Sequence, residues 1–138
     1  MEKAIDQGAD ELDLVWNVSA FKSGMTWPKI EIAKAAALAH QDERILKVII
    51  ETALLSPEEI ITACGICQDA GVDFVKTSTG FATSGAQLDD VKLMRASLSD
   101  HVGIKASGGI STREAAEAFV KAGADRLGTS SGVKIISS

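Results

Sequence analysis

Residues 71–80 read Gly71-Val72-Asp73-Phe74-Val75-Lys76-Thr77-Ser78-Thr79-Gly80, and this stretch is the strongest indication of the fold class. It opens with a glycine, the residue that enters the left-handed conformation at a helix end most cheaply. Apolar and β-branched residues follow, as expected of a buried strand, and small hydroxyl residues with a second glycine then form a loop. The order of helix end, strand and loop predicts one repeating unit of an α/β protein.

The same junction between a glycine and a strand recurs at Gly8-Ala9-Asp10 and at Gly123-Ala124-Asp125. Short β-branched runs alternate along the chain with longer stretches of helical periodicity. The predicted strands are Glu11 to Asn17, Ile45 to Glu51, Asp73 to Ser78, Val102 to Ala106 and Asp125 to Thr129. The predicted helices are Pro28 to Gln41, Pro57 to Ala70, Ala86 to Ser99 and Thr112 to Ala122, and a further helix is expected before the first strand.

Two of the predicted helices start with a recognisable capping sequence. Ser56-Pro57-Glu58-Glu59 provides a capping serine, a first-turn proline and a glutamate that can reach back to the serine. Ser111-Thr112-Arg113-Glu114 is expected to repeat this capping box. These signals support the helix starts.

The alternation predicts an α/β fold with five parallel strands. Such an array can be an open doubly wound sheet or part of a (β/α)8 TIM barrel, and a complete barrel usually takes about 250 residues. The chain has 138 residues, which is the size of a single domain, and we find no linker or low-complexity run within it. Residues 1–138 are therefore expected to form one domain.

The composition excludes several classes of protein. A hydrophobic fraction of 46% with 24% charged residues is typical of a globular domain, and a net charge of -5 makes nucleic acid an improbable partner. No apolar run is long enough to span a membrane and the N-terminus does not resemble a signal peptide, so a cytoplasmic protein is expected. Cys64 and Cys67 fall in the middle of a helix without further metal ligands, which favours two reduced, partly buried thiols over a zinc or redox site.

Two lysines lie near the carboxyl ends of neighbouring predicted strands, where active sites of parallel α/β proteins gather. They are Lys76, and Lys105 in Gly103-Ile104-Lys105-Ala106-Ser107. One such lysine alone is commonly a strand-end ion pair that reaches solvent. Two at matched positions indicate instead that one ammonium favours loss of the proton from the other, which leaves a nucleophilic amine.

Asp13, on the first predicted strand, is a candidate acid for the same site. If it faces inward, it can pair with Lys105 or relay protons during condensation of an amine with a carbonyl. The neighbouring acids Asp10 and Glu11 allow another interpretation, in which all three form a charged strand entry. Both interpretations of Asp13 remain open on the pattern alone.

Glycine-rich loops follow the last two predicted strands, at Gly108-Gly109-Ile110-Ser111 and Gly128-Thr129-Ser130-Ser131-Gly132. In barrels, loops at this place often bind a phosphate through backbone N–H groups. A single pair of glycines would be an ordinary tight turn. The second, serine-rich loop favours a phosphate site.

Along nearly its whole length the sequence resembles the deoxyribose-phosphate aldolase family of class I aldolases. Besides residues 74–80, the resemblance is carried by Gly8-Ala9-Asp10-Glu11-Leu12-Asp13, Leu46-Lys47-Val48-Ile49-Ile50-Glu51-Thr52, Val91-Lys92-Leu93-Met94-Arg95, Gly103-Ile104-Lys105-Ala106-Ser107-Gly108-Gly109-Ile110 and Gly128-Thr129-Ser130-Ser131-Gly132. The resemblance implies a (β/α)8 fold and reversible cleavage of 2-deoxy-D-ribose 5-phosphate to D-glyceraldehyde 3-phosphate and acetaldehyde, without a metal or another cofactor.

The resemblance also implies roles for individual residues. Lys76 matches the lysine that forms the Schiff base, Lys105 the lysine that perturbs it, and Asp13 the acid that relays protons. Lys47 matches a further family lysine that can face Asp13. The positions that match the phosphate site are Gly80, Gly108, Gly109, Ser130 and Ser131.

The chain departs from the family in length, because its motifs correspond to strands four to eight and the first three βα units have no counterpart. Such a partial barrel is expected to leave two unpaired strand edges and an apolar interior facing water. We therefore expect marginal stability, or a homo-oligomer that completes the barrel. An alternative function is a non-catalytic phosphosugar-binding or assembly module derived from the same barrel.

Overall fold

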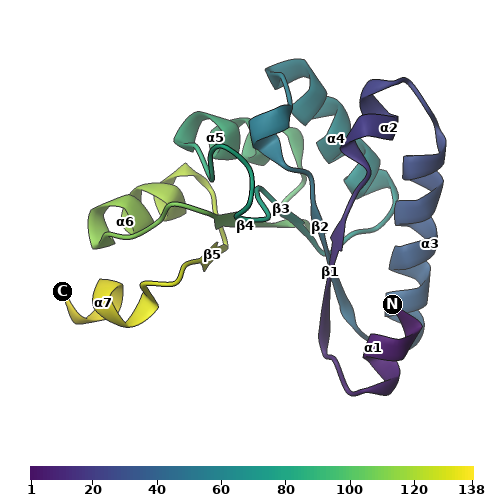
Figure 1. The fold of residues 1–138 in the computed structure, drawn as a ribbon, viewed down its shortest axis with the longest axis horizontal. Coiled ribbons are helices and arrows are strands. Elements are labelled where there is room, and N and C mark those ends of the chain that lie inside the picture. Colours follow the sequence, from purple (N-terminus) through teal and green to yellow (C-terminus); the bar gives the residue numbers. More distant parts are fainter.

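A computed structural model describes residues 1–138, which form one parallel five-stranded sheet in the order β1-β2-β3-β4-β5. The strands are β1 (Glu11–Val15), β2 (Ile45–Ile49), β3 (Phe74–Lys76), β4 (Gly103–Ser107) and β5 (Arg126–Gly128). Seven α-helices and one 3-10 helix accompany them: α1 (Glu2–Asp6), α2 (Val18–Lys22), α3 (Trp27–Gln41), η1 (Thr52–Leu54), α4 (Pro57–Asp69), α5 (Leu88–Ser97), α6 (Arg113–Ala122) and α7 (Gly132–Ser137). The sheet is curved, with α3 to α6 along its outer side (Figure 1). The architecture is a partial α/β barrel, as predicted.

Every predicted strand and helix is present, although most are shorter than expected. Backbone hydrogen bonds continue past the ends of the strands, as when Ile50 N donates to Lys76 O at 3.0 Å and Thr77 N to Lys105 O at 3.0 Å. The sequence did not predict α2, η1 or α7. Each is a single turn or little more, which is too short to produce a periodic pattern.

One of the two predicted capping boxes is confirmed. The Ser56 hydroxyl accepts from Glu59 N at 3.2 Å, and Ser56 N donates to the Glu59 carboxylate at 2.9 Å. The second prediction is wrong, because α6 is capped by Thr112, which accepts from Ala115 N at 3.1 Å. The cap lies one residue later than expected, and an alanine three positions on has no side chain that can reciprocate.

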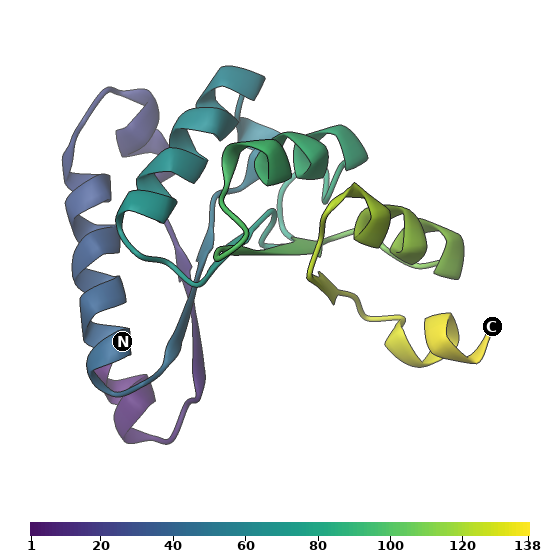
Figure 2. The ribbon, with the colours of Figure 1, turned by 180° about the vertical axis from the view of Figure 1, so that it is seen from behind.

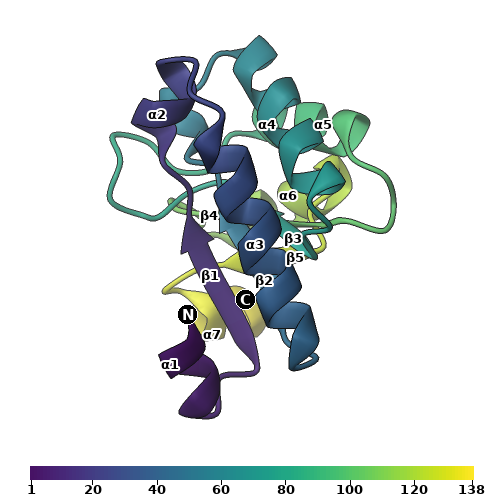
Figure 3. The ribbon, with the colours of Figure 1, turned by 90° about the vertical axis from the view of Figure 1, so that its right-hand side faces the viewer.

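The hydrophobic core lies between the outer face of the sheet and its helices. Leu46, Val48 and Ile104 alternate with the inward positions of their strands and are fully buried. They pack in one cluster with Ile32 of α3 and Ile60 of α4. Figure 2 shows the four long helices side by side from behind, and Figure 3 shows the molecule from the side of β1 and α3. None of these four helices covers the opposite, concave face of the sheet (Figure 1), although Lys47 and Ile49 on that face are buried.

The concave face is mixed in character, so the prediction of an apolar interior is only partly confirmed: Val15, Ile45, Ile49 and Phe74 project to it beside six charged residues. The pleat directs alternate residues to this face, and the register aligns them across the sheet. The charged residues there are Glu11, Asp13, Lys47, Lys76, Lys105 and Arg126. Four cations and two anions leave an excess of positive charge on this face, whereas the whole chain carries a net charge of -5. Such a face attracts anionic ligands.

The repeated glycine-x-aspartate junctions also connect neighbouring strands. The Asp73 carboxylate accepts from Leu46 N at 2.8 Å, and the Asp125 carboxylate accepts from Ile104 N at 2.9 Å. In each case the aspartate before one strand binds the N–H of the preceding strand. None of the helices combines the length and the apolar character that crossing a membrane requires.

Candidate active site

Lys76 and Lys105 occupy directly paired positions on the neighbouring strands β3 and β4. In a parallel pair, aligned residues project to the same face, so both amines extend over the concave side. Both also line the same cavity. The expectation that the two lysines share one site is confirmed.

Asp13 forms ion pairs with two lysines but not with the one expected. Its carboxylate lies 2.8 Å from Lys47 Nζ and 3.0 Å from Lys76 Nζ. The predicted pair with Lys105 is absent, because the two carboxylate oxygens are bound by Lys47 and Lys76 on the nearer strands β2 and β3. Burial acts to raise the pKa of Asp13, but the hydrogen bonds from Lys47 and Lys76 outweigh it and hold the pKa below its ordinary value. The acid is therefore ionised and linked directly to Lys76.

Lys47 faces inward toward Asp13, as the sequence suggested. It is buried and lies 3.0 Å from the Glu11 carboxylate in addition to its bond with Asp13. Burial acts to lower the pKa of Lys47, but the bonds to Asp13 and Glu11 prevail and raise the pKa above its ordinary value. Lys47 therefore stays protonated between two carboxylates.

Lys105 has the opposite environment. No carboxylate lies within ion-pair distance of its amine. Burial first, and then the charges of Lys76 and Lys47, lower the pKa of Lys105 below its ordinary value. The amine cluster thus contains one lysine that loses its proton more readily than an ordinary lysine.

The sequence did not single out Arg126, which is the sixth charged group of the concave face. Its guanidinium binds the Glu11 carboxylate and also lies 4.4 Å above the centre of the Phe74 ring. The Phe74 ring in turn packs so tightly on Gly103 that a Cβ atom there would lie 2.4 Å from a ring carbon. Arg126 pairs with Lys105 across β4 and β5 and therefore shares its face. This register could not be read from the sequence alone.

Buried hydroxyl groups fix the strand ends that carry the two lysines. Ser107 N donates to the Thr77 hydroxyl at 3.1 Å, and the Ser107 hydroxyl donates to Ser78 O at 2.9 Å. The Ser78 hydroxyl completes the set by donating to that of Thr77 at 3.0 Å. Satisfied buried networks of this kind rigidify the elements that they join. The hydroxyl residues after Lys76 therefore act on backbone geometry.

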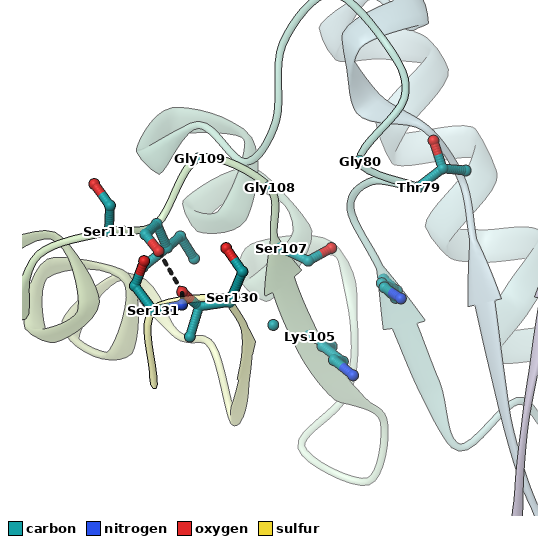
Figure 4. Close-up of a pocket in the computed structure, with 13 residues that line it drawn as sticks. Thr79, Gly80, Lys105, Ser107, Gly108, Gly109, Ser111, Ser130 and Ser131 are labelled. Carbon is teal, nitrogen blue, oxygen red and sulfur yellow. Dashed lines mark hydrogen bonds between the residues drawn. The ribbon is translucent and has the colours of Figure 1, made fainter. Parts of the chain in front are cut away.

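A cavity of about 420 Å³ opens beside the two lysines at the carboxyl ends of β3, β4 and β5. Figure 4 shows its walls, with Thr79 and Gly80 on one side and the serine-rich loop on the other. Its lining residues are Lys76, Thr79, Gly80, Lys105, Ser107, Gly108, Gly109, Ile110, Ser111, Gly128, Thr129, Ser130 and Ser131. All five residues assigned to phosphate binding thus lie around one cavity, together with both lysines.

The backbone of this cavity has donors to offer. The N–H groups of Gly80, Gly108, Gly109 and Ser130 make no hydrogen bond to another backbone group. Clustered free N–H groups are typical of phosphate-binding loops. Gly108 is required for the shape, because its φ is +89° and a Cβ there would lie 2.8 Å from Gly85 Cα.

The cavity thus brings two lysine amines and several free backbone N–H groups together at the carboxyl ends of the strands of a partial α/β barrel. No group of three or more His, Cys, Asp or Glu side chains is arranged to hold a metal ion.

Comparison with known proteins agrees with this arrangement. The family described as "DeoC/LacD family aldolase" matches residues 1–138. A deoxyribose-phosphate aldolase of Thermococcus gammatolerans is 51% identical over 135 residues, which cover 97% of this chain and 60% of the relative. The chain belongs to the DeoC/LacD aldolase family.

Solved structures show the same likeness. A structure described as a putative deoxyribose-phosphate aldolase from Coccidioides immitis superposes with a TM-score of 0.91 at 42% identity, over 99% of this chain and 55% of that chain. A deoxyribose phosphate aldolase from Aeropyrum pernix, described as having a unique tetrameric structure, gives a TM-score of 0.88 at 34% identity, over 99% of this chain and 57% of that chain. The chain therefore spans about 60% of the length of the curated relatives that it matches.

Proposed function

We propose that the chain carries the amine site and the phosphate site of a class I aldolase that cleaves 2-deoxy-D-ribose 5-phosphate reversibly to D-glyceraldehyde 3-phosphate and acetaldehyde. The observation that carries this proposal is the single cavity that Lys76 and Lys105 share with the glycine and serine loops. The substrate is taken from the names of relatives about 50% identical to this chain. Cavity and family agree, since a phosphorylated aldehyde needs both an amine and an anion site.

Lys76 is proposed as the nucleophile. Its neutral amine adds to the aldehyde carbon of the open-chain sugar, and the resulting carbinolamine loses water to give a protonated Schiff base. This cation withdraws electrons as the bond between C2 and C3 breaks, while the C3 hydroxyl gives up its proton and becomes the aldehyde of glyceraldehyde 3-phosphate. The enamine left on Lys76 gains a proton at C2, and water then releases acetaldehyde and restores the amine.

Asp13 is proposed as the acid and base for these proton transfers. Its carboxylate lies 3.0 Å from Lys76 Nζ, within reach of the carbinolamine that would form there. Lys47 holds the same carboxylate at 2.8 Å from the other side and so fixes its orientation. Lys105 is proposed as the lysine that perturbs Lys76, since the two residues are paired across β3 and β4 and line one cavity.

The phosphate is proposed to lie at the far end of the cavity, against Gly80, Gly108, Gly109, Ser130 and Ser131. The free N–H groups of the three glycines and of Ser130, together with the serine hydroxyls, would bind its oxygens. The excess positive charge of the concave face would draw the anion in. Holding both ends of one substrate fixes the reacting carbon near Lys76.

We further propose that residues 1–138 form one domain, equivalent to the last five βα units of the barrel, and that the unpaired edges β1 and β5 are covered by further barrel elements or by copies of the chain. The tetramer of the Aeropyrum pernix relative supports association within the family. The mass of the folded species in solution tests this. The cytoplasmic location and the absence of nucleic-acid partners stay predictions from the sequence.

The proposal is tested by incubating the folded chain with 2-deoxy-D-ribose 5-phosphate and measuring the release of acetaldehyde. Lys76→Met is expected to abolish release, whereas the matched control Lys22→Met, which removes a lysine of α2, should retain it. Release that survives Lys76→Met would overturn the assignment. A folded chain that binds the sugar phosphate without cleaving it would favour the non-catalytic binding module.

A further inference from the structure

Glu51, at the end of β2, has an unusual combination of conformation and burial. Its φ of +58° lies in the left-handed region, which residues other than glycine, asparagine and aspartate seldom adopt. The residue is only 7% exposed. A strained backbone and a buried carboxylate both cost free energy, and such costs persist where the surrounding structure enforces them, often at functional sites.

The carboxylate of Glu51 is satisfied by a single residue of another loop. It accepts from the hydroxyl of Thr79 at 2.5 Å and from Thr79 N at 3.3 and 3.4 Å. The Glu51 carboxylate forms no ion pair with a lysine, arginine or histidine. The hydrogen bonds to Thr79 are therefore the interactions that hold this charge in the interior.

Through these contacts Glu51 anchors the turn that follows Lys76. The flanking backbone is already joined to β3, since Ile50 N donates to Lys76 O and Thr52 N to Thr77 O at 2.9 Å. Thr79 passes the constraint on, because its hydroxyl also accepts from Phe81 N at 3.1 Å. Gly80 lies between Thr79 and Phe81, which these bonds hold in place. Its φ is +96°, and its free N–H lines the cavity.

We propose that Glu51 is a positioning residue for the phosphate subsite: through Thr79 it fixes the turn that presents the Gly80 N–H to an anion, without touching the anion itself. This proposal rests on the proposed function for the identity of the ligand, but its geometry stands on contacts outside the amine cluster. It also explains why a strained, buried glutamate occupies a place where glycine would be easier. A glycine relieves the strain but cannot reach Thr79.

The test uses the full chain and inorganic phosphate as the probe. Glu51→Gly is expected to raise the Kd for phosphate about tenfold, the size of one lost hydrogen bond to an anion. Glu51→Gln should raise the Kd about threefold, because its amide oxygen still accepts from Thr79. The matched control is Glu43→Gly, which relieves a φ of +57° at an exposed residue and should leave the Kd unchanged.

Thermal unfolding of the same variants separates positioning from general stability. The inference predicts that phosphate affinity falls in Glu51→Gly even at temperatures where the variant is fully folded. It also predicts that Thr79→Val adds little to Glu51→Gly, since both remove the same link. An unchanged phosphate Kd in folded Glu51→Gly, or an unmodified chain that does not bind phosphate, would overturn it. Phosphate binding without acetaldehyde condensation would instead count against the proposed function alone.

Discussion

Arg126 on β5 binds the Glu11 carboxylate on β1, with its Nη1 atom 2.9 Å from one oxygen and 2.7 Å from the other. The residues are 115 positions apart and belong to the two edge strands of the sheet. Their contact requires the sheet to curve until side chains from both edges meet over the concave face. The pair thus connects the two ends of the partial barrel directly.

The pair of Arg126 and Glu11 should make the free energy of unfolding fall as the pH is lowered. Hydrogen bonds from Arg126, and then from Lys47, lower the pKa of Glu11 from 4.5 to about 2. Because the folded pKa lies below the unfolded one, the unfolded chain binds more protons between these values, and the contribution of Glu11 is lost as the pH falls through this range. Glu11→Gln should therefore unfold with a flatter pH dependence, measured by urea titration between about pH 6 and pH 3.

The matched control for Glu11 is Glu117→Gln, which removes one partner of an exposed pair within α6. Exposed pairs of this kind contribute about 0.3–0.5 kcal/mol, so the control should keep the pH dependence of the unmodified chain. Equal slopes for Glu11→Gln and the unmodified chain would show that the contact between the edges contributes nothing in solution.

The amine cluster predicts an order of reactivity for its lysines. The pKa of Lys105 is lowered and that of Lys47 is raised, so Lys105 should react with acetic anhydride at lower pH than an added model amine, and Lys47 at higher pH. Peptide mass analysis over a range of pH measures this. Lys76→Met should move the Lys105 midpoint upward, because the neighbouring charge is gone. A Lys105 midpoint at or above that of the model amine would contradict the geometry.

How far the sequence could predict this site depends on the kind of pattern. Matched positions near the carboxyl ends of neighbouring strands predicted that Lys76 and Lys105 share one site, and the glycine loops identified the cavity wall. The partner of Asp13 could not be predicted, because it depends on which strand adjoins β1 and in what register. The same holds for Arg126, whose importance comes from a residue at the opposite edge. Glu51 carried no local signal, since its left-handed φ contradicts its own propensity.

The fold shows the same division. Glycine junctions and apolar runs predicted the order of strands and long helices, which local propensity determines. The character of the interior was predicted only in part, because alternate residues of one strand face opposite sides: Leu46 and Val48 pack on the helix side, whereas Lys47 faces the concave side. Barrel interiors are commonly filled by branched apolar residues, and here charged residues lie among them.

The position of the core gives a prediction for stability. Leu46→Ala should cost about 2–5 kcal/mol, because Leu46 is fully buried between the sheet and its helices. Val15→Ala should cost about 0.5 kcal/mol or less, since Val15 is 52% exposed. Denaturant midpoints measure both. Similar losses for the two variants would mean that the concave face is packed in solution, as it would be after self-association.

The glycine loop after β4 gives a prediction for two matched variants. Gly108 and Gly109 both have positive φ, at +89° and +77°, but only a Cβ on Gly108 would meet the backbone of Gly85. Gly109→Ala should cost about 1–2 kcal/mol from backbone strain alone. Gly108→Ala should cost about 2–4 kcal/mol, because overlap with Gly85 adds to the strain. If thermal unfolding gave equal losses, the close approach of the two loops would be refuted.

Borohydride reduction in the presence of acetaldehyde, followed by peptide mass mapping, tests the central claim that Lys76 is the amine that condenses with the carbonyl. Lys47, Lys76 and Lys105 compete within one cluster in a single reaction, so the label reports directly on which one is nucleophilic. We expect a stable two-carbon adduct on Lys76 that disappears in Lys76→Met. An adduct on Lys105 or Lys47 in its place, or no adduct on a folded chain, would contradict it.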